Sequence, residues 1–119
     1  MRVHQEERLK RIRSELQAAY TLLEHIETSN NLARNKLDLW RAKCKLELAI
    51  LMIKILSGID EEERRARYSV EGEPQKVLAK ALELIANASN SILTTNPHDV
   101  LEKVRRARDL LWLLESKNL

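Results

Sequence analysis

Apolar residues recur along most of the chain at alternating steps of three and four, the spacing that lines one face of an α-helix. Three segments carry a single row of this kind. The rows are Leu9, Ile12, Leu16, Ala19, Leu23 and Ile26; then Leu78, Ala81, Ile85, Ala88 and Ile92; then Val100, Val104, Ala107, Leu111 and Leu114. They predict three amphipathic helices that pack on one shared core.

The segment after the first row carries two apolar rows on nearly opposite sides of a single helix. One row is Leu37, Trp40, Cys44, Leu48, Leu51 and Ile55, and the other is Leu32, Leu39, Leu46, Ile50 and Ile53. We assign the first row to the core, with Cys44 as a buried structural thiol. The second row is covered either by a connecting segment of the chain or by a partner. In the second case, this row forms the predicted partner interface, with Trp112 as an anchor.

Residues that start or stop helices separate these segments. The breaks are Thr28-Ser29-Asn30-Asn31, Ser57-Gly58 and Asn96-Pro97, and Pro74 stands at a first helical position. Asp60 and Glu63 have capping-box spacing, which predicts a short helix from Glu61 to about Arg67, followed by a loop from Tyr68 to Glu73. Short linkers favour neighbours that run in alternating directions.

Composition supports the same fold class. The chain has 119 residues, of which 44% are hydrophobic and 33% charged, with only two glycines and two prolines. That length and that scarcity of helix breakers predict a single helical-bundle domain over residues 1–119. We therefore expect an all-α, antiparallel bundle of four main helices plus one short connecting helix.

The lone cysteine excludes an intramolecular disulfide framework. No stretch resembles a signal peptide, and the longest apolar segment, from Leu46 to Leu56, is shorter than a membrane span. We expect a cytoplasmic protein that makes no use of a membrane.

Positive charge is concentrated rather than spread evenly. The formal net charge is +3, and the second helix alone has an excess of four positive charges. Together with the last helix it supplies the candidate phosphate contacts Arg34, Arg41, Lys43, Lys45, Arg105 and Arg106. Aromatic residues for base stacking are scarce at 3%, and in a simple four-corner bundle these two helices lie diagonally opposite.

Residue patterns for catalysis or metal binding are weak. The three histidines are His4, His25 and His98, and His98 has a carboxylate one helical turn away, at Glu102. Two such groups alone do not make a metal site, and two glycines cannot build a phosphate-binding loop. We expect no enzyme, no cofactor and no metal, and identify no small-molecule substrate.

These patterns favour a non-enzymatic interaction or scaffold protein that forms a homo-oligomer or docks a protein partner. The predicted interface is Leu39, Leu46, Ile50, Ile53 and Trp112. Binding or coating of nucleic acid by the basic helix flanks is the alternative, and steep salt dependence would be its signature.

Overall fold

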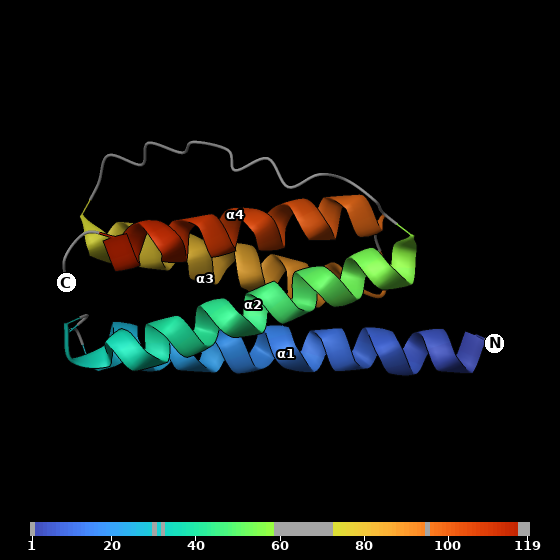
Figure 1. The fold of residues 1–119 in the computed structure, drawn as a ribbon, viewed down its shortest axis with the longest axis horizontal. Helices are drawn as coiled ribbons and strands as arrows, with labels where there is room; N and C mark the ends of the chain where they lie inside the picture. Colours follow the sequence, from blue (N-terminus) through green and yellow to red (C-terminus); the bar gives the residue numbers. More distant parts are fainter. Residues whose placement is uncertain (1, 30, 32, 59–72, 95, 117–119) are drawn as a thin grey trace.

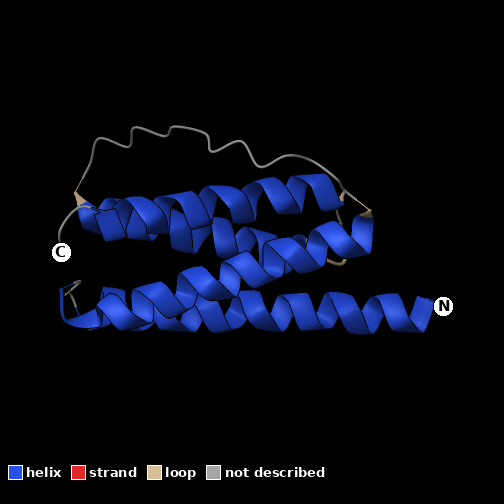
Figure 2. Ribbon diagram, in the orientation of Figure 1, coloured by secondary structure: helices blue, strands red, loops and turns tan. Residues whose placement is uncertain are grey.

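The computed structural model describes residues 2–29, 31, 33–58, 73–94 and 96–116, with side-chain exposure from residue 6 onward. Within these ranges the ordered elements are helical, with no strand (Figure 2). They are α1 (Arg2–Ser29), α2 (Lys36–Ser57), α3 (Pro74–Ser91) and α4 (Pro97–Ser116), with a 3-10 turn at Ala33–Asn35 before α2. The prediction of four main helices in an all-α fold is confirmed. The short helix predicted at 61–67 lies outside the described residues.

The helices pack as a ring in which α1 contacts α2 and α3, and α4 contacts the same two helices (Figure 1). α2 and α4 are therefore neighbours, not diagonally opposite as in a simple four-corner bundle, and the structure thereby decides a point that the sequence left open. α2 ends at one end of the bundle and α3 begins at the other, so these two helices run in the same direction (Figure 1). Helix direction therefore does not alternate strictly along the chain, although each helix runs opposite to the two helices that it contacts (Figure 1).

The apolar rows of α1, α3 and α4 form the core as predicted. Every member of the three rows is buried except Leu9, which is partly buried at the edge. Many of the largest side chains, including Leu16, Ile85 and Leu111, are less than 2% exposed. Burying a side chain of this size contributes about 1.5–3 kcal/mol relative to leaving it in water, so these rows hold the bundle together.

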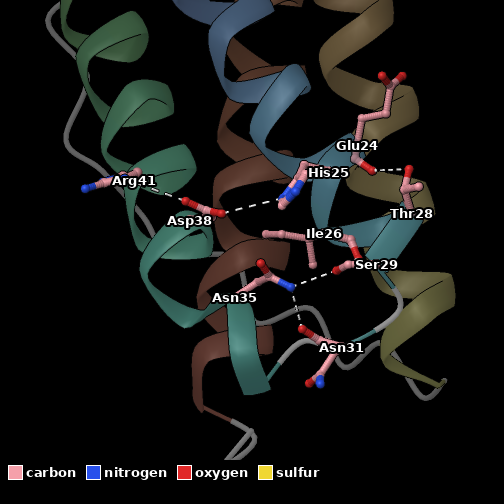
Figure 3. A network of polar contacts seen from close by, with 9 residues as sticks. All are labelled: Glu24, His25, Ile26, Thr28, Ser29, Asn31, Asn35, Asp38 and Arg41. Atoms are coloured by element: carbon pink, nitrogen blue, oxygen red, sulfur yellow. Dashed lines mark hydrogen bonds and ion pairs between the residues drawn. The ribbon is translucent and has the colours of Figure 1, made fainter.

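The turn between α1 and α2 is held by polar side chains. Asn35 donates its amide Nδ2 to Ser29 Oγ and to the carbonyl oxygen of Asn31, both at 2.7 Å (Figure 3). The side-chain Oδ1 of Asn31 accepts from the backbone N–H of Arg34 at 3.1 Å. These bonds satisfy backbone and side-chain groups where one helix stops and the next starts, which confirms the predicted break.

The other predicted breaks also coincide with helix ends. Gly58 follows the last residue of α2 with a positive φ of 64°, and its N–H donates to the carbonyl of Lys54. Pro74 is the first residue of α3, and Pro97 is the first residue of α4. Asn96 caps α4 by accepting the N–H of His98 at 3.0 Å. The chain thus uses proline at helix starts and glycine at a helix end, where their backbone preferences fit.

Candidate interaction surface

The two apolar faces of α2 are exchanged relative to the prediction. The inner face consists of Leu39, Ala42, Leu46, Ala49, Ile50 and Ile53, each at most 3% exposed. Four of the five predicted interface residues, Leu39, Leu46, Ile50 and Ile53, therefore belong to the bundle's own core. Their placement in a partner interface is wrong, because α1 and α4 already cover them.

Side-chain size explains which face turns inward. The inner face includes Ala42 and Ala49, which are fully buried and whose small side chains take up little room between packed helices. The outer face instead carries Trp40, too bulky to fit between close-packed helices without forcing them apart. Counting the two alanines with the large apolar residues widens the inner row in the sequence, but this signal does not say on which side of α2 another helix packs.

The outer face of α2 consists of Leu37, Trp40, Cys44, Leu48, Leu51 and Ile55. All are exposed, and the five other than Cys44 range from 41% for Leu48 to 69% for Ile55. The assignment of Cys44 to the core is therefore wrong. Seven large hydrophobic residues are exposed in the described part of the chain, and five of them lie in this one row. Such concentration distinguishes the row from isolated apolar residues, which are normal on protein surfaces.

Trp112 on α4 extends this row sideways. Two ion pairs align α4 with α2: Arg108 lies beside Glu47, and Glu115 lies beside Lys43. Trp112 lies between Arg108 and Glu115 along α4, so it is level with the segment of α2 around Cys44. Arg108, Trp112 and Glu115 are spaced by single helical turns and share the flank of α4 that faces α2. The Trp112 indole is 47% exposed. We call the outer face of α2 together with Trp112 the apolar surface.

Ion pairs border the outer face on the side of α4. Lys43 Nζ lies 3.0 Å from Glu115 Oε2, and Arg108 Nε lies 3.6 Å from Glu47 Oε1. The guanidinium of Arg108 also lies 3.2 Å from Asp109 Oδ1, and its side chain is only 7% exposed. These contacts join α2 to α4, so charged side chains hold the two helices together along the border between the inner and outer faces.

Ion pairs also border the outer face on the side of α1. Lys45 Nζ lies 3.1 Å from Glu15 Oε2, and Arg41 Nη1 lies 3.7 Å from Asp38 Oδ1. Asp38 also lies 3.7 Å from His25 Nδ1, which joins the end of α1 to the start of α2 (Figure 3). The apolar row thus runs between two charged borders, the arrangement of an interface core and its rim.

The candidate phosphate contacts do not gather on one face. Arg41 and Lys45 border the α1 side of α2, whereas Lys43 borders the α4 side. All three already lie beside a carboxylate, which would compete with a phosphate for the same charge. Arg34 is exposed in the 3-10 turn, and Arg105 and Arg106 lie on α4. The geometry therefore adds nothing to the nucleic-acid interpretation.

Shallow depressions lined by described residues occur on two sides of the bundle. One, of about 310 Å³, lies along the α2 row and is lined by Glu47, Leu48, Ile50, Leu51 and Lys54. The other, of about 410 Å³, lies between α1 and α3 and is lined by Gln17, Tyr20, Thr21, Ile85, Ala86, Ser89 and Asn90. The second has no carboxylate, histidine, lysine or arginine among its lining residues, whereas the first indents the apolar surface itself.

Among the described residues, no group of three or more His, Cys, Asp or Glu side chains is placed to hold a metal ion. The acidic run Asp60–Glu63 lies outside that part of the chain. None of the four helices is long and apolar enough to cross a membrane.

Comparison with known proteins assigns no relative to this chain. No family model, no curated protein and no solved structure matches it. A proposed function for this chain therefore rests on the apolar surface.

Proposed function

We propose that this chain is a non-enzymatic protein-interaction or scaffold module that self-associates or docks a protein partner through the apolar surface. The residues proposed to make the contact are the outer face of α2 and Trp112, in place of the inner-face residues indicated by the sequence. Trp40 and Trp112 are its natural anchors, since tryptophan is enriched among the residues that dominate binding energy.

The observation that carries this proposal is the exposure of a five-turn apolar row on one helix. Large hydrophobic residues left in water cost about 25 cal/mol for each Å² that a contact could cover. A monomeric protein rarely exposes a contiguous apolar patch beyond a few hundred Å² unless that patch binds something. The charged borders on both sides support the same interpretation, because an apolar centre with a polar rim is the anatomy of a binding surface.

Light scattering after size exclusion, combined with fluorescence of the apolar dye ANS, tests the proposal. We expect a concentration-dependent rise in mass, or ANS binding by the dilute monomer, and expect Leu48→Glu to abolish it. Leu93→Glu is the matched control, because Leu93 has 45% exposure against 41% for Leu48 and lies off the apolar surface, beyond the end of α3.

A protein that stays monomeric at high micromolar concentration and binds no ANS would contradict the proposal. Adding single-stranded and duplex oligonucleotides at low and high salt tests the alternative in the same instrument. A salt-sensitive shift that survives Leu48→Glu but is lost in the double variant Arg41→Ala/Lys45→Ala would assign the chain to nucleic-acid binding instead.

A further inference from the structure

We infer that the occupant of the apolar surface is a second copy of this chain. This inference rests on the proposed function. The two α2 helices pack antiparallel across a two-fold axis that passes beside Cys44. Homodimers with this symmetry are the commonest oligomers of soluble proteins, and they require a surface that is complementary to itself. The spacing of the apolar residues on the outer face, the shape of its surface and the positions of its charges each meet that requirement.

The spacing of the outer face from Leu37 to Leu51 is the same from either direction, and Ile55 lies beyond this symmetric part. From Leu37 through Trp40, Cys44 and Leu48 to Leu51 the steps are three, four, four and three. An antiparallel copy centred on Cys44 places Trp40 level with Leu48 of the second copy, and Leu37 level with Leu51 of the second copy. Trp40, Cys44 and Leu48 form one ridge with steps of four, the row that interdigitates in the commonest class of helix packing.

The shape of the apolar surface is complementary to that of the second copy in the same register. Trp40 is half-exposed on α2 four residues before the axis, and the 310 Å³ depression lies after the axis, lined by residues from Glu47 to Lys54. Both lie toward the α4 border of α2, as their helical positions show. A two-fold axis perpendicular to the helices brings like borders together, so each Trp40 faces the depression of the other copy.

Trp112 and the charges are also placed for this contact. Because Trp112 lies level with Cys44, the two Trp112 rings approach the axis from the same side. The α4 border presents Lys43 within about two residues of the level of Glu47 of the second copy. On the α1 border, Arg41 and Lys45 each lie beside a carboxylate of their own chain. The pairing therefore brings no uncompensated block of like charge together.

The available area suits a dimer of standard size. If a fully exposed large apolar residue presents about 200 Å², the six outer residues Leu37, Trp40, Leu48, Leu51, Ile55 and Trp112 contribute roughly 600 Å². A standard interface buries about 800 Å² per partner, so the flanking side chains need to supply only the remainder. The chain's own segment 59–72 has only Ile59, Tyr68 and Val70 as large apolar residues, too few to match a five-turn row.

Cys44 supplies a direct probe of the register because it is the only cysteine of the chain and is exposed. Under mild oxidation with copper phenanthroline, the full chain is expected to form a covalent dimer through Cys44 within minutes. The control variant Cys44→Ser/Leu93→Cys carries an exposed thiol away from the apolar surface and is expected to cross-link at least tenfold more slowly. Leu48→Glu is expected to slow the Cys44 reaction to the rate of that control.

A mixed pair of variants tests helix direction. Cys44→Ser/Leu37→Cys mixed with Cys44→Ser/Leu51→Cys is expected to yield the 37–51 heterodimer in preference to either homodimer. A parallel pairing would reverse that preference and overturn the register. Light scattering on the same variants shows whether they still associate, so a failed fold is not mistaken for a failed register.

The outcomes separate this inference from the proposed function. A dimer that Leu48→Glu dissociates but that cross-links at neither Cys44 nor 37–51 overturns the antiparallel register and leaves the interaction function standing. A monomer at high concentration that binds ANS through the same face overturns the second-copy inference alone and points to a different protein as occupant. A monomer without ANS binding overturns both.

Discussion

The inner and outer faces of α2 carry nearly the same apolar side chains and have opposite environments. The inner face has Leu39, Leu46 and Ile53 at no more than 2% exposure, whereas the outer face has Leu37, Leu51 and Ile55 above 50%. One helix therefore presents two similar surfaces, one covered by α1 and α4 and the other facing solvent. Apolar composition alone does not distinguish a core from an interface, since both consist of the same residue types.

What distinguishes the two faces is side-chain size and the borders between them. Small residues on the inner face permit close packing, and the large Trp40 on the outer face does not. Ion pairs along both sides of α2 then hold the helix in this rotation, because turning it would bury charged groups such as Lys43 or Lys45 without their carboxylates. Substitutions on each face and on the borders test whether these parts of α2 contribute differently to the free energy of unfolding.

The largest expected difference is between matched leucines on the two faces. Leu46→Ala removes a side chain with 0% exposure and is expected to lower the free energy of unfolding by about 2–5 kcal/mol. Leu48→Ala, on the exposed face, is expected to change it by about 0.5 kcal/mol or less in the dilute protein. Urea denaturation at low concentration measures both. Equal losses would mean that the outer face is also packed within the monomer.

The border toward α4 is expected to give the next largest effect. Arg108→Ala leaves Asp109, which is only 17% exposed, without the guanidinium beside it, and Glu47 loses the same neighbour. We expect a loss of about 1–3 kcal/mol in the free energy of unfolding. Arg41→Ala on the opposite border is the control and is expected to cost about 1 kcal/mol at most, because its ion pair is largely exposed. A smaller loss for Arg108 than for Arg41 would contradict this ranking.

Gly58 determines where both faces of α2 end, and its substitution is expected to have a moderate effect. Its φ of 64° is unfavourable for a side chain, and a Cβ added there meets no atom within 4 Å. Gly58→Ala should therefore cost about 1 kcal/mol through backbone strain alone. Gly58→Asn should recover part of that loss, since asparagine tolerates the left-handed conformation. Thermal denaturation of the two variants provides the measurement, and identical losses would rule out backbone conformation as the cause.

The smallest effect is expected at the border toward α1. Asp38 lies 3.7 Å from Arg41 and from His25, and both of these side chains are more than half exposed. Asp38→Asn should lower stability by about 0.5 kcal/mol at low salt, and by less as added salt screens the charges. Urea denaturation in low and high salt tests this. A loss that salt does not reduce would show that Asp38 acts through hydrogen bonding rather than through charge.

Local patterns in the sequence determined most of the fold. Steps of three and four placed the core residues of α1, α3 and α4, because an amphipathic helix has one apolar side and only one way to cover it. Proline at Pro74 and Pro97 and glycine at Gly58 located helix ends from backbone preference alone. These features depend on residues close together in the chain, so no knowledge of neighbouring helices was needed to read them.

Only the tertiary structure decided which face of α2 is inside and which helices are its neighbours. Periodicity reports the angle of a residue around its own helix axis, but it does not say on which side another helix lies. With apolar rows on both sides, that choice depended on packing against α1 and α4. The position of α4 depended in turn on α3 beginning at the far end of the bundle from the end of α2. The exposed face and its meeting with Trp112 follow from these long-range contacts, which no local pattern specifies.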